Sequence, residues 1–146
     1  MQQRDYILRL IEMAGAVLRE ALRRVLGGAA SEDEVHEAIS LAGARVGIDA
    51  RIALLATPET LEMMVAPTGE VDLTRCWVLA ESLFVAGAHA EAAGDPALGR
   101  QYFEKARRLF ILLDPSLVVV GLPEAAERVR EIDRRLSASD GPDSAA

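Results

Sequence analysis

A helix-length stretch with almost no polar face is the feature that most constrains the fold of this chain. Asp72 can cap the free N–H groups at its start, and Gly94 stops it, so we expect a helix from residue 73 to Ala93. Past Arg75 its polar residues are Glu81, Ser82, His89 and Glu91. Because a surface helix carries a broad polar face, this helix belongs in the middle of a bundle.

The composition agrees with an all-helical chain. Apolar residues make up 51% of the 146 residues, but aromatic residues only 4%, so alanine and leucine dominate. These two residues favour helices, whereas β-branched and aromatic residues favour strands. A chain of this length fits one domain. We expect a single domain over residues 1–136 and a disordered tail over residues 137–146.

Capping residues, glycines and prolines divide the chain into further helices. Ser31 with Glu34 forms a capping-box pattern, and Pro58 and Pro96 stand at first-turn positions. The three valines at residues 118–120 could form a short extended piece, but the sequence offers no second strand to pair with it. The expected helices run over residues 3–26, 32–46, 50–56, 58–65, 73–93, 96–113 and 123–136.

The helix over residues 3–26 is strongly amphipathic. Its apolar residues recur at spacings of three and four, while arginines and glutamates take the other side. The apolar stripe contains Ile7, Leu10, Ile11, Ala14, Leu18, Ala21, Leu22 and Val25. Such a stripe packs either inside its own domain or across a homodimer, and the sequence leaves both readings open.

The hairpin over residues 80–110 resembles a tetratricopeptide repeat (TPR), in which two helices cross closely at small residues. The matching residues are Gly87, Gly94, Asp95, Phe103 and Ala106. The sequence departs from the repeat at Ala90, where Tyr is usual, and at Gly99, where Ala is usual. The resemblance implies irregular TPR-like hairpins, packed as one compact right-handed all-α bundle of about six to seven helices.

A longer resemblance covers most of residues 2–113. The opening QRDYILRLIE, the motif Thr57-Pro58-Glu59-x-Leu61 and the spacing Gly69-x-x-Asp72 are similar to a family of uncharacterised bacterial proteins. The stretch GGAASEDEV departs from that family, which has Gly-x-Tyr-x-x-Ala there. The family carries no assigned activity, so this likeness supports the fold and leaves the function open.

Charge and apolar content argue against several classes of protein. The net charge of −7 does not suit a nucleic-acid binder, which needs a basic face, and it repels anionic membranes. No stretch approaches the roughly 18 apolar residues of a membrane span, and Arg9 and Glu12 interrupt the N-terminal apolar run. We therefore expect a cytoplasmic protein that binds neither nucleic acid nor membrane.

The residues that could carry chemistry are scattered, so we expect no enzyme, no metal and no cofactor. His36 falls in an acidic helix and is expected at the surface, and His89 is expected to bond between helices. Cys76 is the only cysteine, which excludes an intrachain disulfide and a thiolate cage. Its position near a helix start could lower a thiol pKa, but a buried apolar role is favoured.

Binding fits the sequence better than catalysis. By the TPR resemblance, the concave surface would present Glu81, Phe84, Ala88, Glu91 and Ala92. This surface lacks the Lys, Arg and Asn that grip a peptide carboxylate, and an acidic, apolar groove prefers a basic, apolar helix. The arginine-bearing first helix of a second copy is one candidate partner. In the alternative reading, the first or the C-terminal helix of the same chain packs over these residues.

Two hypotheses follow, with a homodimeric scaffold as a third possibility. The first is a non-catalytic protein–protein interaction module, which an open groove beside Phe84 and Glu91 would favour. The second is a small-molecule-binding or enzymatic bundle with a pocket near Trp77, Glu81 and His89, which a perturbed pKa at Glu81 or His89 would favour. The first is preferred.

Overall fold

The structure is a computed structural model that describes residues 2–113 and 123–139. All the regular structure in these two ranges is helical. The helices are α1 (Gln2–Leu26), α2 (Glu32–Arg45), α3 (Ile52–Leu55), α4 (Pro58–Val65), α5 (Leu73–Ala92), α6 (Pro96–Leu112) and α7 (Ala125–Ser139). The predicted all-α bundle of about six to seven helices is confirmed. The TPR-like character of its hairpins stays a prediction.

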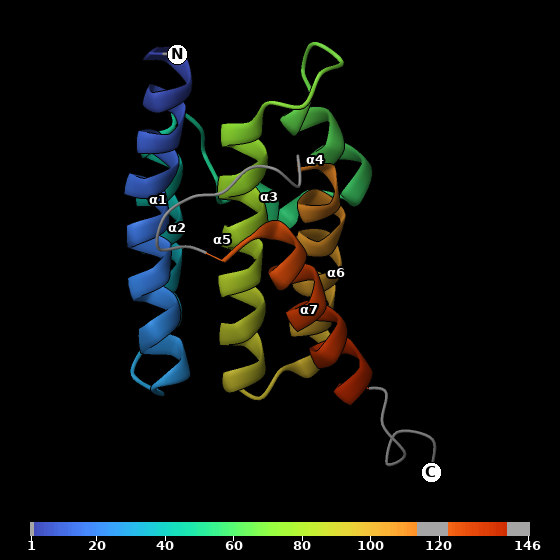
Figure 1. The fold of residues 1–146 in the computed structure, drawn as a ribbon. Helices are drawn as coiled ribbons and strands as arrows, with labels where there is room; N and C mark the ends of the chain where they lie inside the picture. The colour runs from blue at the N-terminus through green and yellow to red at the C-terminus, as the bar shows by residue number, and fades with distance from the viewer. Residues whose placement is uncertain (1, 114–122, 140–146) are drawn as a thin grey trace.

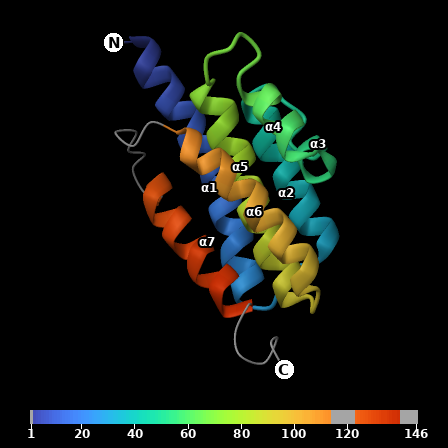
Figure 2. The same cartoon turned by 90° about the vertical axis from the view of Figure 1, so that its right-hand side faces the viewer.

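Helix α5 lies in the middle of the bundle, as its sequence predicts. In Figures 1 and 2, α1 and α2 lie on one side of α5 and α6 on the other, while α7 runs along α6. The short helices α3 and α4 pack against the first half of α5. Every residue of α5 from Cys76 to Ala88 is buried, so no face of its central turns reaches solvent.

Helix α1 packs inside its own domain. Five residues of its predicted stripe are buried: Ile11, Ala14, Leu18, Ala21 and Val25. They lie against α5 and α2, so the stripe itself is not free to bind a second copy. The expected homodimer through α1 stays a prediction, and it would have to use the outer face of the helix, where Tyr6 and Met13 are exposed.

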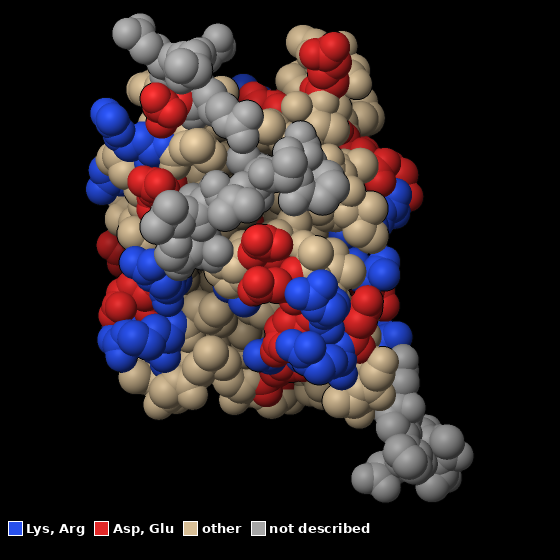
Figure 3. All heavy atoms as spheres, in the orientation of Figure 1, with Lys and Arg blue, Asp and Glu red and all other residues tan. Residues whose placement is uncertain are grey.

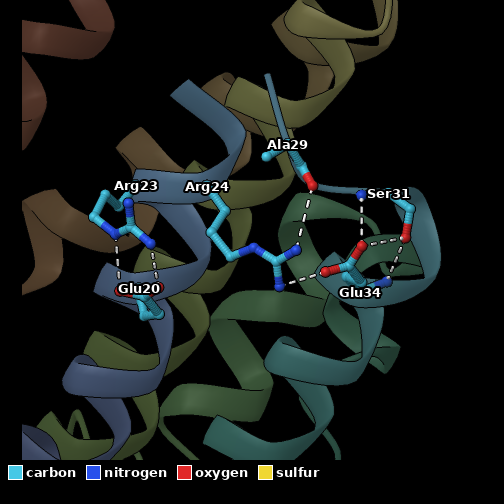
Figure 4. A network of polar contacts seen from close by, with 6 residues as sticks. All are labelled: Glu20, Arg23, Arg24, Ala29, Ser31 and Glu34. Carbon is cyan, nitrogen blue, oxygen red and sulfur yellow. Dashed lines mark hydrogen bonds and ion pairs between the residues drawn. The ribbon is translucent and has the colours of Figure 1, made fainter. Parts of the chain in front are cut away.

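The joint between α1 and α2 is fixed by polar contacts (Figure 4). Arg24, in the last turn of α1, pairs with the carboxylate of Glu34 and donates to the carbonyl of Ala29. The Ser31 hydroxyl accepts from the Glu34 amide, and the Glu34 carboxylate accepts from the Ser31 amide. This is the predicted capping box, and Gly28 supplies the left-handed turn with a φ of 74°.

Some expected boundaries are wrong. Helix α3 has only four residues, and Asp49 caps a turn before it by accepting from the Arg51 amide. Helix α7 begins at Ala125, not Pro123, and continues to Ser139, so residues 137–139 of the expected tail are helical. Residues 140–146 and the three valines at residues 118–120 lie outside the described residues.

The described helices include none that is both long and apolar enough to cross a membrane.

Candidate functional site

The five residues predicted for the concave surface separate into two groups. Glu81, Phe84 and Ala88 are almost fully buried, Glu91 is half-buried, and Ala92 at the end of α5 is exposed. The predicted groove is therefore not an open one. Its floor is covered by α7, whose two inward arginines reach the carboxylates of Glu81 and Glu91.

Two phenylalanines form the apolar floor of the site. The rings of Phe84 on α5 and Phe103 on α6 lie with centroids 5.5 Å apart and are tilted by 58°. Gly87 makes this arrangement possible, because a Cβ there would lie 2.8 Å from the Phe103 ring. Likewise, a Cβ at Gly99 would lie 3.1 Å from Cγ of Glu91. Two missing side chains thus leave room for two residues of the site.

Arg128 of α7 occupies one end of this floor. Its Nη2 lies 2.6 Å from one carboxylate oxygen of Glu81, and its Nε donates to the other at 3.2 Å. The guanidinium carbon lies 4.2 Å from the centroid of the Phe84 ring. A planar guanidinium can satisfy both partners at once, because it stacks on an aromatic face while its edge binds a carboxylate.

Arg135, two turns further along α7, occupies the other end. Its Nη1 donates to Glu91 at 2.6 Å, and its guanidinium carbon lies 5.5 Å from the Phe103 centroid and 5.7 Å from that of Phe84. Glu131 accepts from its Nε at 3.0 Å and so holds the side chain in place. We name the set Glu81, Phe84, Glu91 and Phe103 the arginine-binding face.

Two further contacts attach α7. Ile132 is its one fully buried residue among those whose burial is described, and Arg107 of α6 donates to Asp133 at 2.7 Å. The predicted stripe of this helix needs one correction. Ala126 is exposed, and Ala125 packs against the core in its place. Val129 and Leu136, the other residues of the stripe, are half-buried and also pack against the core.

The pKa of Glu81 is raised because burial removes water from its carboxylate, and the nearby Arg128 only partly opposes this. A perturbed pKa is the observation expected to favour a small-molecule or catalytic site, and the groove beside Phe84 and Glu91 expected for the interaction module is largely covered by α7. The burial that raises the pKa is produced together with α7, whose Arg128 occupies both carboxylate oxygens.

The alternative site near Trp77, Glu81 and His89 is not assembled as a pocket. Trp77 is buried, and the Glu81 carboxylate is bound by α7. His89 lies eight residues beyond Glu81 on the same helix, which separates the two by about 12 Å along the axis. Three groups so placed do not converge on one reacting atom, which catalysis requires.

The other residues that could carry chemistry, Cys76 and His36, lie in surroundings that do not activate them for catalysis or metal binding. The Cys76 thiol donates to the Leu109 carbonyl at 3.1 Å, and burial raises its pKa to about 12, with Asp72 adding to the rise. It is therefore a buried apolar residue, as favoured, and not an activated nucleophile. His36 is half-buried and lies 4.0 Å from Glu32. Among the described residues, no three His, Cys, Asp or Glu side chains are grouped to hold a metal.

The sequence predictions include the two acidic residues of this face, Glu81 and Glu91, but not its arginines. Arg128 and Arg135 are seven residues apart, which places them on one side of a helix with Ile132 between them. That spacing was visible in the sequence. Phe103 was identified only as a packing residue of the hairpin, because its ring also forms the hairpin contact.

No protein-family model, curated protein or solved structure matches this chain. The resemblances to the tetratricopeptide repeat and to the bacterial family therefore stay predictions.

Proposed function

We propose that this protein is a non-catalytic interaction module that binds an amphipathic, arginine-bearing helix on its arginine-binding face. One observation carries the proposal: α7 already lies on this face in the manner of a bound peptide. It uses one buried aliphatic anchor, Ile132, and two arginines that each pair with a carboxylate and cover an aromatic ring. Helix-in-groove recognition uses anchors at these spacings.

The chemistry of the face favours a cationic, helical ligand over a small polar substrate. Two carboxylates stand at opposite ends of a two-ring floor, so a single small molecule would leave one of them unpaired. Leaving Glu81 unpaired would be costly because its carboxylate is buried, and leaving the half-buried Glu91 unpaired would cost less. Two guanidinium groups on one helix satisfy both carboxylates and keep the rings covered, which is the arrangement seen with α7.

The raised pKa of Glu81 supports a second candidate function, a bundle that binds a small molecule or acts on one. In that case Glu81 would be the working group, and α7 would be a cover over its pocket. This candidate predicts that freeing Glu81 from Arg128 creates a site for a small cation. The interaction module predicts a site for a helix.

The test uses the full chain with Ile132→Asp, which places a carboxylate at the buried anchor and should release α7 from its place. Fluorescence anisotropy would measure binding of a labelled peptide of residues 123–139. We expect binding to this variant, and loss of binding when Glu81→Gln and Glu91→Gln are added. Circular dichroism would check that each variant stays helical. A folded Ile132→Asp variant that ignores the peptide would overturn the proposed function.

A further inference from the structure

Helix α7 does not fill the site completely. A crevice of about 220 Å³ lies between α7 and the end of α1. In the lower half of Figure 3, a strip of uncharged surface separates the charged side chains of α1 from those of α7. The crevice is lined by Leu22, Leu26, Phe84, Pro123, Glu127, Arg128, Glu131, Arg134 and Arg135.

The two sides of this crevice do not match in chemistry. The side formed by α1 and α5 is apolar, with Leu22, Leu26 and the Phe84 ring, and Leu26 is 63% exposed. The α7 side presents mostly charged residues, among them Glu127 and Arg134. The Phe84 ring is already buried, but Leu26 faces charged side chains across the crevice, so α7 leaves apolar area uncovered whose burial would stabilise the contact.

The mismatch follows a regular pattern on α7. Residues 127, 131 and 134 are spaced by four and three, so they form one stripe of the helix that faces the crevice. Residues 128 and 135 are each one position further on, so the two arginines form the neighbouring stripe that faces the rings. The middle residue of the crevice stripe, Glu131, also holds Arg135. Glu131 also accepts from Nε of Arg134 at 3.1 Å, so Glu131 and Arg134 pair with each other along the crevice stripe.

We propose that the partner of this protein is a helix that keeps the two arginines seven residues apart, with an aliphatic residue between them, and carries large apolar residues where α7 has Glu127 and Arg134. This inference rests on the proposed function and names the ligand of that site. Such a helix makes the contacts of α7 and also fills the crevice over Leu22 and Leu26. We expect this helix to displace α7, which belongs to the same chain and covers the arginine-binding face without filling the crevice.

The sequence of α1 argues against the other partner considered, the first helix of a second copy. No two of its arginines are seven residues apart. Its apolar stripe is also used within the domain. Helix α7 has the arginine and aliphatic part of the required pattern, through Arg128, Ile132 and Arg135, and we expect the partner to add the apolar residues.

The experiment compares two labelled peptides of residues 123–139 on the unmodified full chain, in which α7 is in place. The first carries Glu127→Leu and Arg134→Leu, which face the crevice. The matched control carries Glu124→Leu, just before α7, and Arg130→Leu, within α7; both residues are exposed and neither lines the crevice. Both peptides lose one acid and one base and gain two leucines, so net charge and overall hydrophobicity are equal.

We expect the crevice-facing peptide to bind at least about tenfold more tightly than the control, because two leucines gain apolar contact. Its binding should also increase hydrogen exchange at the amides of residues 125–136 in the intact chain, since α7 is displaced. Equal affinity of the two peptides, or tight binding without faster exchange in α7, would overturn this inference. The proposed function would survive either result, since peptide binding to the Ile132→Asp variant tests it separately.

Discussion

Helices α1 and α7 both lie against the central hairpin, but they are held by different kinds of contact. Helix α1 buries a continuous stripe that includes Ala14 and Leu18, with small and aliphatic residues against α5. Helix α7 buries one aliphatic residue fully, Ile132, and Val129 and Leu136 only in part, and its two inward arginines lie on carboxylates and rings. The first kind of contact belongs to a folding core, and the second is typical of a bound helix that can leave.

The largest effect should come from cutting the α1 contact. Leu18→Ala removes a fully buried side chain where α1 contributes to the core, and we expect the free energy of unfolding to fall by about 2–5 kcal/mol. Urea denaturation followed by circular dichroism would measure it as one cooperative transition. The control, Leu26→Ala on the same helix, removes an exposed side chain and should change stability little. Similar losses for both variants would contradict the assignment of α1 to the core.

The next effect should come from breaking the buried ion pair under α7. Arg128→Met leaves the Glu81 carboxylate without its partner, at 3% exposure, and should weaken docking of α7 at pH 7 by about 2–3 kcal/mol. Hydrogen exchange in α7 would report the loss. The core beneath should unfold as before, because α7 can leave without opening α5. Loss of the whole fold would show that α7 is part of the core.

The Arg128→Met variant should also change how the docking of α7 depends on pH. Burial raises the pKa of Glu81 in the docked state, and removing Arg128 leaves that cause unopposed. A carboxyl whose pKa is raised on docking stabilises the docked state when protonated, and that contribution is lost as pH rises through the docked-state pKa. The deficit of Arg128→Met relative to the unmodified chain should therefore be larger at pH 8 than at pH 5. Adding Glu81→Gln should make it independent of pH.

A smaller effect is expected at Gly87, where the missing side chain leaves room for the Phe103 ring. The Cβ introduced by Gly87→Ala would lie 2.8 Å from the buried Phe103 ring, so that ring must shift. We expect a loss of about 1–3 kcal/mol in unfolding free energy, together with weaker peptide binding. Gly27→Ala is the control, because its Cβ would lie no closer than 3.4 Å to a neighbouring backbone oxygen. Unchanged peptide binding by Gly87→Ala would argue against Phe103 as part of the face.

The sequence predicts the α1 contact better than it predicts the α7 contact. The apolar periodicity of α1 and the nearly all-apolar α5 predict their burial directly, since a single local pattern determines both. The acidic residues of the face, Glu81 and Glu91, were also predicted. The sequence does not tell whether the first or the C-terminal helix covers these two residues. Which helix covers them depends on long-range packing, and the periodicity of a single helix does not encode it. The raised pKa of Glu81 has the same origin.

A still smaller effect tests whether guanidinium geometry matters. Arg135→Lys keeps the charge beside Glu91 but loses the planar group that lies over the two rings and reaches Glu131. Because this pair is partly exposed, we expect docking of α7 to weaken by only about 0.5–1 kcal/mol. Hydrogen exchange in α7 would measure it. The control is Arg134→Lys, on the exposed side of α7. An equal effect there would mean that the guanidinium geometry of Arg135 does not contribute to docking.

The smallest effect, no change at all, gives the sharpest test of the comparison. The Cys76 thiol, with a pKa of about 12 and a bond to the Leu109 carbonyl, should react with a thiol reagent at pH 8 only when the core opens. Leu18→Ala should therefore speed its labelling, roughly in proportion to the stability lost. Ile132→Asp should leave the labelling rate unchanged, because the departure of α7 does not separate α5 from α6. If Ile132→Asp exposed Cys76 as strongly as Leu18→Ala, then α7 would hold the core together, and its likeness to a bound ligand would no longer support a helix-binding function.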